Sequence, residues 1–166
     1  MKKTLKIIIP LVCVFSLIFQ TPILAEEEKD DCPSEYLEYF QEIGEMYGIC
    51  PELLQAIAYY ESNYHPGETS ATNCQGLMQV SYRYQQSRME KLGVNSLYDP
   101  YGNILVATDY IMEMASEYID VYVVLVAYRY GEYSSQLESC IKYGTHYSYA
   151  DKVLAYSSYL EQVHGK

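Results

Sequence analysis

Apolar side chains recur along most of this chain at the three-to-four-residue spacing of an α-helix. This spacing predicts amphipathic helices over residues 32–48, 50–62 and 149–163. Gly48 lies where the first helix should end, and Pro51 falls in the first turn of the second, where proline is tolerated. The pattern therefore predicts a helical framework at both ends of the chain.

The middle of the chain is less regular. Residues 63–75 are rich in Pro, Gly, Ser, Thr and Asn and are expected to form a loop. A short helix is predicted over 82–93, a turn over 95–103, and a longer helix over 104–118.

Residues 120–131, "DVYVVLVAYRYG", are ambiguous, because their β-branched run favours a strand by propensity. No partner strand is evident elsewhere, so a buried helix is the better prediction. The expected fold class is therefore all-α, with one domain and no internal repeats.

One carboxylate is out of place in this pattern. Leu54, Ile57 and Ala58 define the apolar stripe of the helix that starts at Pro51, and Glu61 follows Ala58 by three residues. Glu61 therefore falls on the inward face, at the helix end where unpaired carbonyls disfavour negative charge.

Burial and these carbonyl dipoles both destabilise the ionised form of Glu61, so its pKa should be raised. A carboxyl group that keeps its proton near neutral pH can serve as a general acid. The alternative is structural: the side chain bends out to solvent or pairs with a base such as Arg83 or Arg129.

The N-terminus has the pattern of an export signal. Residues 1–25 combine a lysine-rich start, a short apolar core interrupted by Pro10, and a small-residue exit after Ala25. A retained membrane anchor is the alternative, although the apolar run is short for a stable span. We expect an acidic leader over 26–33 and a single domain over 34–166.

Charge limits the possible partners. Without the three lysines of the signal, eight basic residues face 22 acidic ones, a net charge of −14. This balance argues against nucleic acid or an anionic membrane as a partner. The chain contains 21 tyrosines and no tryptophan, and tyrosine rings can stack on sugars while their hydroxyls bind polar edges.

Four cysteines remain after signal removal, and an even number in an exported chain suggests two disulfides. Cys32 and Cys50 flank a predicted helix about 20 Å long, which is too far for a bridge. Of the remaining pairings we favour Cys50–Cys74 with Cys32–Cys140, and free or intermolecular thiols are the alternative.

Four short motifs occur in a recognisable order. "ELLQAIAYYESNYHP" is followed by "GLMQV", then by "DPYGNILVATDYI" and "VLVAYRYG", and finally by "YADKVLAY". Together they resemble the lytic transglycosylase (SLT) domain of the lysozyme-like superfamily, over roughly residues 36–160. The resemblance implies a single lysozyme-like helical domain with a glycan-binding cleft.

The resemblance also implies a role for each matched residue. Glu61 would be the catalytic acid and base, with the Ser62 hydroxyl beside it. Gln79 and Met78 would line the sugar cleft, the first by hydrogen bonds and the second by packing on a ring. The two aromatic matches would be Tyr128, with its hydroxyl approaching the glutamate, and Tyr149, in the cleft wall. Leu77 and Met78 could instead be core residues, and Tyr149 fits a helix stripe in any case.

The implied substrate is the β-1,4 bond between N-acetylmuramic acid (MurNAc) and N-acetylglucosamine (GlcNAc) in peptidoglycan. Most glycosidases use two carboxylates, and no second one is obvious here; Glu68 and Asp99 are the nearest candidates. A lytic transglycosylase needs only one, because the muramoyl 6-hydroxyl attacks within the same sugar and leaves a 1,6-anhydro ring.

Two departures from the family pattern leave other functions open. The chain has Arg129 where the family has asparagine, and Tyr130 where it has a small alanine. A muramidase that hydrolyses the same bond, or an inactive glycan-binding module, are the alternatives.

The expected location is extracytoplasmic, at the cell wall, with a further envelope protein as a possible partner. No cofactor or metal is expected, since His65 is separated from Glu61 by four residues but Pro66 breaks the helix.

Overall fold

The structure is a computed structural model, and it describes residues 32–166. The predicted signal (1–25) and all but the last two residues of the acidic leader (26–33) lie outside the described residues.

The described chain contains seven helices and one very short two-stranded ribbon. The elements in chain order are α1 (Ser34–Tyr47), α2 (Pro51–Ser62), β1 (Cys74–Gln75), β2 (Val80–Ser81), α3 (Tyr82–Leu92), α4 (Pro100–Glu117), α5 (Val121–Tyr130), α6 (Ser135–Tyr143) and α7 (Ser148–Val163). The prediction of a mainly helical domain is confirmed.

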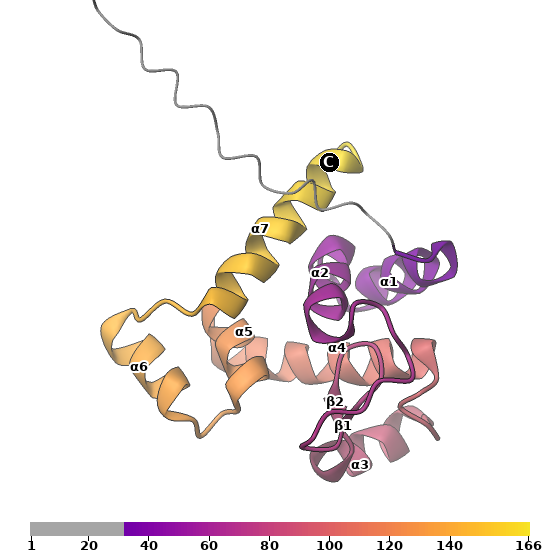
Figure 1. Cartoon of the computed structure of the whole chain (residues 1–166), viewed down its shortest axis with the longest axis horizontal. Coiled ribbons are helices and arrows are strands. Elements are labelled where there is room, and N and C mark those ends of the chain that lie inside the picture. The colour runs from indigo at the N-terminus through magenta and orange to yellow at the C-terminus, as the bar shows by residue number, and fades with distance from the viewer. Residues whose placement is uncertain (1–31) are drawn as a thin grey trace, which may run out of the picture.

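Helix α2 lies at the centre of the helical body. It packs between α1 and α7, while α4 runs beneath α1 and continues towards α5 (Figure 1). Helix α6 packs on α5 and forms a lobe at one side, and the ribbon and α3 lie on the other side of α4 (Figure 1).

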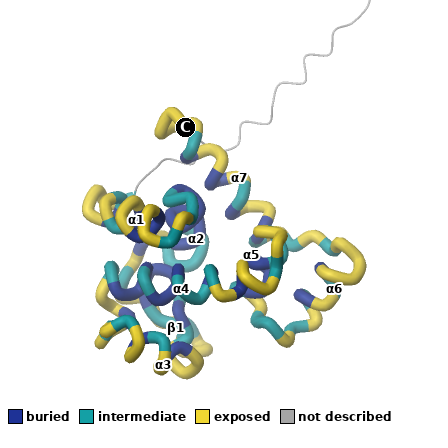
Figure 2. Tube along the Cα trace, turned by 180° about the vertical axis from the view of Figure 1, so that it is seen from behind, coloured by how far each residue is buried: buried dark blue, intermediate teal, exposed yellow. Residues whose placement is uncertain are grey.

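Burial follows this arrangement. Every residue from Glu52 to Ala58 is buried, and buried positions are concentrated along α2 and α4, whereas the outer faces of α1, α3 and α6 are exposed (Figure 2). Leu54, Ile57 and Ala58 are each 0 % exposed, which confirms the apolar stripe predicted for α2. Burial of such side chains is the main stabilising term of a domain of this size.

Helix α5 confirms the helical interpretation of residues 120–131. The Asp120 side chain caps it by accepting a hydrogen bond from the Tyr122 N–H (2.8 Å), and Val124–Ala127 are buried. Packing against α4, α6 and α7 therefore outweighs the strand propensity of the β-branched run.

Three local predictions were wrong. Helix α4 begins at Pro100 rather than at residue 104, because Asp99 caps it by accepting a hydrogen bond from Gly102 N (2.8 Å). Helix α6 was not predicted at all, although Ser134 caps it through Leu137 N. The ribbon was also missed, because two residues per strand give no periodic signal.

Neither predicted disulfide forms. Cys50 precedes the first turn of α2, whereas Cys74 lies on the ribbon, which is tied to the last turn of that helix. Twelve helical residues span about 18 Å, so these two cysteines are too far apart to bond. Cys140 is a buried free thiol on α6, so the second predicted pair is not present either.

No helix within residues 32–166 is both long and apolar enough to cross a membrane.

Candidate active site

Glu61 lies in the last turn of α2 and points inward. Its side chain is only 3 % exposed. The helix ends directly after it, because Asn63 adopts a left-handed conformation (φ 52°) and Tyr64 follows with φ 60°. A left-handed tyrosine is rare, so the backbone here is held in an uncommon conformation by its surroundings.

Three side chains from two other helices surround the Glu61 carboxylate. Arg129 Nη1 on α5 donates to Oε2 at 2.8 Å. The same guanidinium lies 5.3 Å from the centre of the Tyr149 ring on α7, an arrangement typical of a cation–π contact. The charge of Glu61 also raises the pKa of the buried Tyr128 hydroxyl on α5, although burial is the larger cause.

Burial raises the pKa of Glu61, and the Arg129 charge and hydrogen bond oppose this without reversing it. The Tyr149 hydroxyl is buried and makes no hydrogen bond of standard geometry within the described chain, yet it lies close enough to the carboxylate to lower its pKa. The predicted inward orientation and the alternative pairing with Arg129 are therefore both present in the same site.

The turn between β1 and β2 is fixed against this helix end. Ser62 Oγ donates to the Leu77 carbonyl at 2.7 Å, and Tyr128 Oη donates to the Met78 carbonyl at 2.6 Å. These two bonds join α2 and α5 to the "GLMQ" turn. Ser62 and Tyr128 thus position the turn with their hydroxyls, and neither hydroxyl bonds to Glu61.

Asn103 on α4 is the centre of this turn's hydrogen bonding. Its amide donates to Gln75 O and to Leu97 O, and its Oδ1 accepts from Met78 N, each at 2.8 Å. Asn103 is 0 % exposed. No role was predicted for it, although the Asn-Ile pair in "DPYGNIL" was part of the resemblance.

Gly76 shows why the turn needs glycine. Its φ is 77°, and a Cβ there would overlap the Leu97 carbonyl oxygen and the Asn103 amide. The close approach of these three residues fixes the course of the turn.

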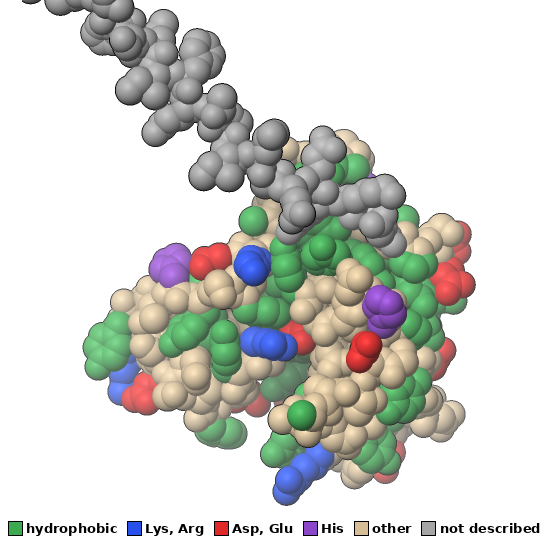
Figure 3. Space-filling model, in the orientation of Figure 1, with side chains coloured by type: hydrophobic (Ala, Val, Ile, Leu, Met, Phe, Trp, Pro, Cys, Tyr) green, Lys and Arg blue, Asp and Glu red, His purple; other side chains and the backbone are tan. Residues whose placement is uncertain are grey.

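A cavity of about 770 Å³ opens beside this site, between the ribbon with α3 and the α5–α6 side of the molecule. The surface in Figure 3 is indented between these two parts. The lining residues include Gln79, Tyr128, Arg129, Glu113 and Glu132, with tyrosines at positions 84, 110, 130 and 133. Glu61 itself is not among them, because Arg129 lies over its carboxylate on the cavity side.

Gln79, which was predicted to line a cleft, and Tyr128, which was matched for a hydroxyl near the glutamate, both line this cavity. Met78 does not: its side chain is 0 % exposed and belongs to the core, as the alternative for this position held. Tyr149, predicted in the cleft wall, is not among the residues that line this cavity, and its ring instead lies against the Arg129 guanidinium.

Asp99 and Glu68, the candidates for a second catalytic carboxylate, do not line the cavity. Asp99 caps α4, and Glu68 is exposed in the loop, where its main-chain carbonyl accepts from Gly76 N (2.9 Å). The acids that line the cavity are Glu113 and Glu132, which the sequence pattern did not single out. Within residues 32–166 no cluster of three or more His, Cys, Asp or Glu side chains could hold a metal ion.

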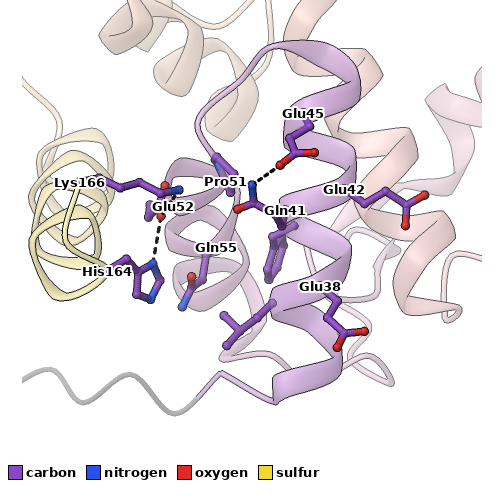
Figure 4. A pocket seen from close by; sticks show the side chains of 11 residues that line it. Glu38, Gln41, Glu42, Glu45, Pro51, Glu52, Gln55, His164 and Lys166 are labelled. Atoms are coloured by element: carbon purple, nitrogen blue, oxygen red, sulfur yellow. Dashed lines mark hydrogen bonds and ion pairs between the residues drawn. The ribbon is translucent and has the colours of Figure 1, made fainter.

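A second hollow, of about 560 Å³, lies between α1, the start of α2 and the C-terminal residues (Figure 4). Its buried carboxylate is Glu52, which is 2 % exposed and bonds to His164 (3.0 Å) and Lys166 (2.8 Å). Burial alone would raise the pKa of Glu52, but hydrogen bonds from Lys166, His164 and Cys50 lower it to about 2.

The two buried glutamates of α2 are thus opposite in character. Glu52 lies at the positive end of the helix and is ionised at any physiological pH, so it cannot donate a proton. Glu61 lies at the negative end and has a raised pKa. Of these two carboxyl groups, only Glu61 has the raised pKa that a general acid requires.

These features define a helical protein with a buried carboxylic acid beside an open, tyrosine-lined cavity. The family model for the transglycosylase SLT domain matches residues 38–147, which is more than half of the chain, so the chain belongs to this family.

Individual relatives agree with this assignment. Over 91 residues the chain is 30 % identical to a protein provisionally named soluble lytic murein transglycosylase from Haemophilus influenzae, covering 52 % of this chain and 15 % of that protein. Over 96 residues it is 29 % identical to membrane-bound lytic murein transglycosylase E of Buchnera aphidicola, covering 49 % of this chain and 43 % of that protein. The chain therefore spans less than half the length of these curated relatives.

A solved structure shows the same fold. The 70 kDa soluble lytic transglycosylase of Escherichia coli superposes with a TM-score of 0.66 at 21 % identity, over 79 % of this chain and 25 % of that one.

Proposed function

We propose that this protein is a peptidoglycan lytic transglycosylase that cleaves the β-1,4 bond between MurNAc and GlcNAc, with Glu61 as its sole general acid and base. The observation that carries the proposal is a single carboxyl group, 3 % exposed and with a raised pKa, beside a cavity large enough for several sugar rings. Family membership and the names of the relatives support the same substrate class.

In the first step, Glu61 donates its proton to the glycosidic oxygen as the bond from that oxygen to the muramoyl C1 breaks. Electron density leaves the ring, and positive charge develops at C1. The Glu61 left behind is ionised, which is the form that the Arg129 guanidinium holds at 2.8 Å in the free protein.

In the second step, the 6-hydroxyl of the same muramoyl ring attacks C1, and its proton passes to Glu61. This restores the acid and closes a 1,6-anhydro ring without water as a reactant. An attacking group within the same sugar also has the proximity advantage of an intramolecular reaction.

The remaining side chains hold the turn and the substrate. Gln79 and the tyrosines of the cavity would contact sugar rings, and Ser62 with Tyr128 would keep the turn in register with Glu61. The substrate lies outside the cytoplasm, so the proposal includes export through the segment 1–25 and action at the cell wall, alone or with an envelope partner.

Digestion of purified cell wall by the mature chain tests the proposal. Mass spectrometry should show muropeptides lighter by one water than the products of a hydrolase, and Glu61→Gln should abolish their formation while its circular dichroism stays native. Glu132→Gln, at a carboxylate that lines the same cavity, should retain activity.

Other outcomes would overturn the proposal in distinct ways. Hydrated products that disappear in Glu132→Gln would identify a two-carboxylate muramidase. Binding of glycan strands without any cleavage would identify a glycan-binding module.

A further inference from the structure

Arg129 stands between the cavity and the catalytic carboxylate. Its side chain is 47 % exposed and lines the cavity, whereas the Glu61 side chain beneath it is 3 % exposed and does not. A sugar that approaches Glu61 from the cavity therefore meets the guanidinium first.

Most of the hydrogen-bonding capacity of this guanidinium is unused. Arginine has five N–H donors, and within residues 32–166 Arg129 makes one hydrogen bond, to Glu61. The other arginine of the cavity, Arg88, is already paired with Asp109 and Glu113 and lies over the Tyr110 ring. Arg129 is therefore the cation of this cavity with donors available to an incoming anion.

Peptidoglycan supplies such anions. The lactyl group of MurNAc carries a carboxylate when no peptide is attached, and the stem peptides carry carboxylates when they are. Arginine binds carboxylates in a planar, two-pronged geometry that suits either source. A chain with a net charge of −11 needs a local cation to hold an anionic strand.

We propose that Arg129 is a specificity-determining residue that binds a carboxylate of the glycan strand in exchange for the Glu61 carboxylate, so that the acid is released only when an anionic strand occupies the cavity. The inference rests on the proposed function. It makes the ion pair a resting state of the free protein and gives the enzyme a preference for charged over neutral strands.

The exchange needs little rearrangement. Arg129 is in the last turn of α5, two residues before Gly131, and its side chain is already about half exposed to solvent. The groups that face Glu61 once the guanidinium turns away are the hydroxyls of Tyr128 and Tyr149, which are both neutral. Neither can replace the charge of Arg129, so the buried carboxylate of Glu61 would then take up a proton from solvent and become the acid.

Three forms of one cell-wall preparation test the inference. The first is intact, with stem-peptide carboxylates; the second is stripped of peptides by an amidase, which leaves lactyl carboxylates; in the third, all carboxylates of the intact wall are converted to neutral amides by carbodiimide coupling. The wild type should cleave at least one charged form about tenfold faster, as kcat/KM, than the neutral form, a difference of about 1.4 kcal/mol. Whichever charged form is preferred identifies the source of the carboxylate.

The variant Arg129→Asn should lose this preference and cleave all three forms at similar rates, while Arg129→Lys should keep part of it. Arg83→Asn, which removes an exposed arginine outside the cavity, should leave the preference unchanged. A loss of folding would lower all rates together and would not alter their ratio.

Equal rates for the wild type on charged and neutral walls would overturn the inference, as would a preference that survives in Arg129→Asn. If the wild type cleaves none of the three forms, the proposed function itself fails. The two failures are therefore distinguishable.

Discussion

Substitution of Asn103 by alanine should both destabilise the domain and disorder the turn between β1 and β2. Asn103 is fully buried on α4 and makes three hydrogen bonds of 2.8 Å, to Gln75 O, Leu97 O and Met78 N. Alanine would leave two carbonyls and one N–H of the main chain without their partner in the interior.

The magnitude follows from these three groups. A buried polar group that loses its partner costs about 1–3 kcal/mol, so three of them would cost about 3–9 kcal/mol. Water entering the space left by the amide would bring the cost towards the lower end. We therefore expect a loss of about 3–5 kcal/mol, which is a large fraction of the 5–15 kcal/mol typical of a domain.

Urea denaturation followed by circular dichroism measures this loss, with Asn95→Ala as the matched control. Asn95 is exposed in the connection before α4, and its substitution should change the free energy of unfolding by less than about 0.5 kcal/mol. A loss below about 1 kcal/mol in Asn103→Ala would refute the reasoning, because the three main-chain groups would then not depend on this side chain.

Three further predictions concern Gly76 and the two buried glutamates. Gly76→Ala should unfold the turn or destabilise the domain by at least about 2 kcal/mol, because the φ of Gly76 is 77° and a Cβ there would overlap Leu97 O. Urea denaturation checks this, with Gly67→Ala as the control, because a Cβ at Gly67 would meet open space. Glu61→Gln should gain stability relative to the wild type as pH rises from 4 to 8, because burial raises the pKa of Glu61 and its ionisation therefore costs stability in the wild type, while Arg129 is left half-exposed rather than buried. Urea denaturation at both pH values checks this, and a relative stability that falls between pH 4 and pH 8 would contradict it. Glu52→Gln should cost about 2 kcal/mol at pH 7, allowing for solvent screening of the half-exposed Lys166, because its pKa is lowered from 4.5 to about 2. That contribution is present above pH 4.5 and disappears as pH falls towards 2, so the two denaturation curves should converge at low pH.

Periodicity in the sequence was sufficient to place Glu61. The residue falls on the same helical face as Leu54 and Ala58, and both the helix and its inward direction are local properties. The helical state of residues 120–131 was predicted for a similar reason, since no second strand was evident to pair with that segment.

The partners of Glu61 could not be derived from local pattern. Arg129 and Tyr149 come from helices 68 and 88 positions further along the chain, and only the packing of α5 and α7 against α2 brings them together. The sequence predicted an inward carboxylate, and its alternatives were a side chain in solvent or one paired with a base. In the structure Glu61 is both buried and paired with Arg129.

The errors have equally specific causes. Met78 was assigned to the cleft by resemblance, but the turn buries its side chain and presents its carbonyl to Tyr128. The disulfides were inferred from the number of cysteines and the length of the first helix, which do not reveal that the ribbon holding Cys74 packs at the opposite end of α2 from Cys50. Helix α6 did have a signal, in Ser134 as its cap and Leu137 and Cys140 three residues apart.

The central claim is that Glu61 holds its proton more tightly than an ordinary glutamate, and a carboxyl titration measures this directly. The protein would be labelled with ¹³C at glutamate side-chain carboxyls, and Glu61→Gln would identify the resonance of Glu61. The account predicts a midpoint above the ordinary value of 4.5 and a further rise in Arg129→Asn, where the charge that opposes burial is gone. A midpoint at or below 4.5 in the wild type would contradict it, because burial would then not destabilise the ionised form of Glu61 as the account requires.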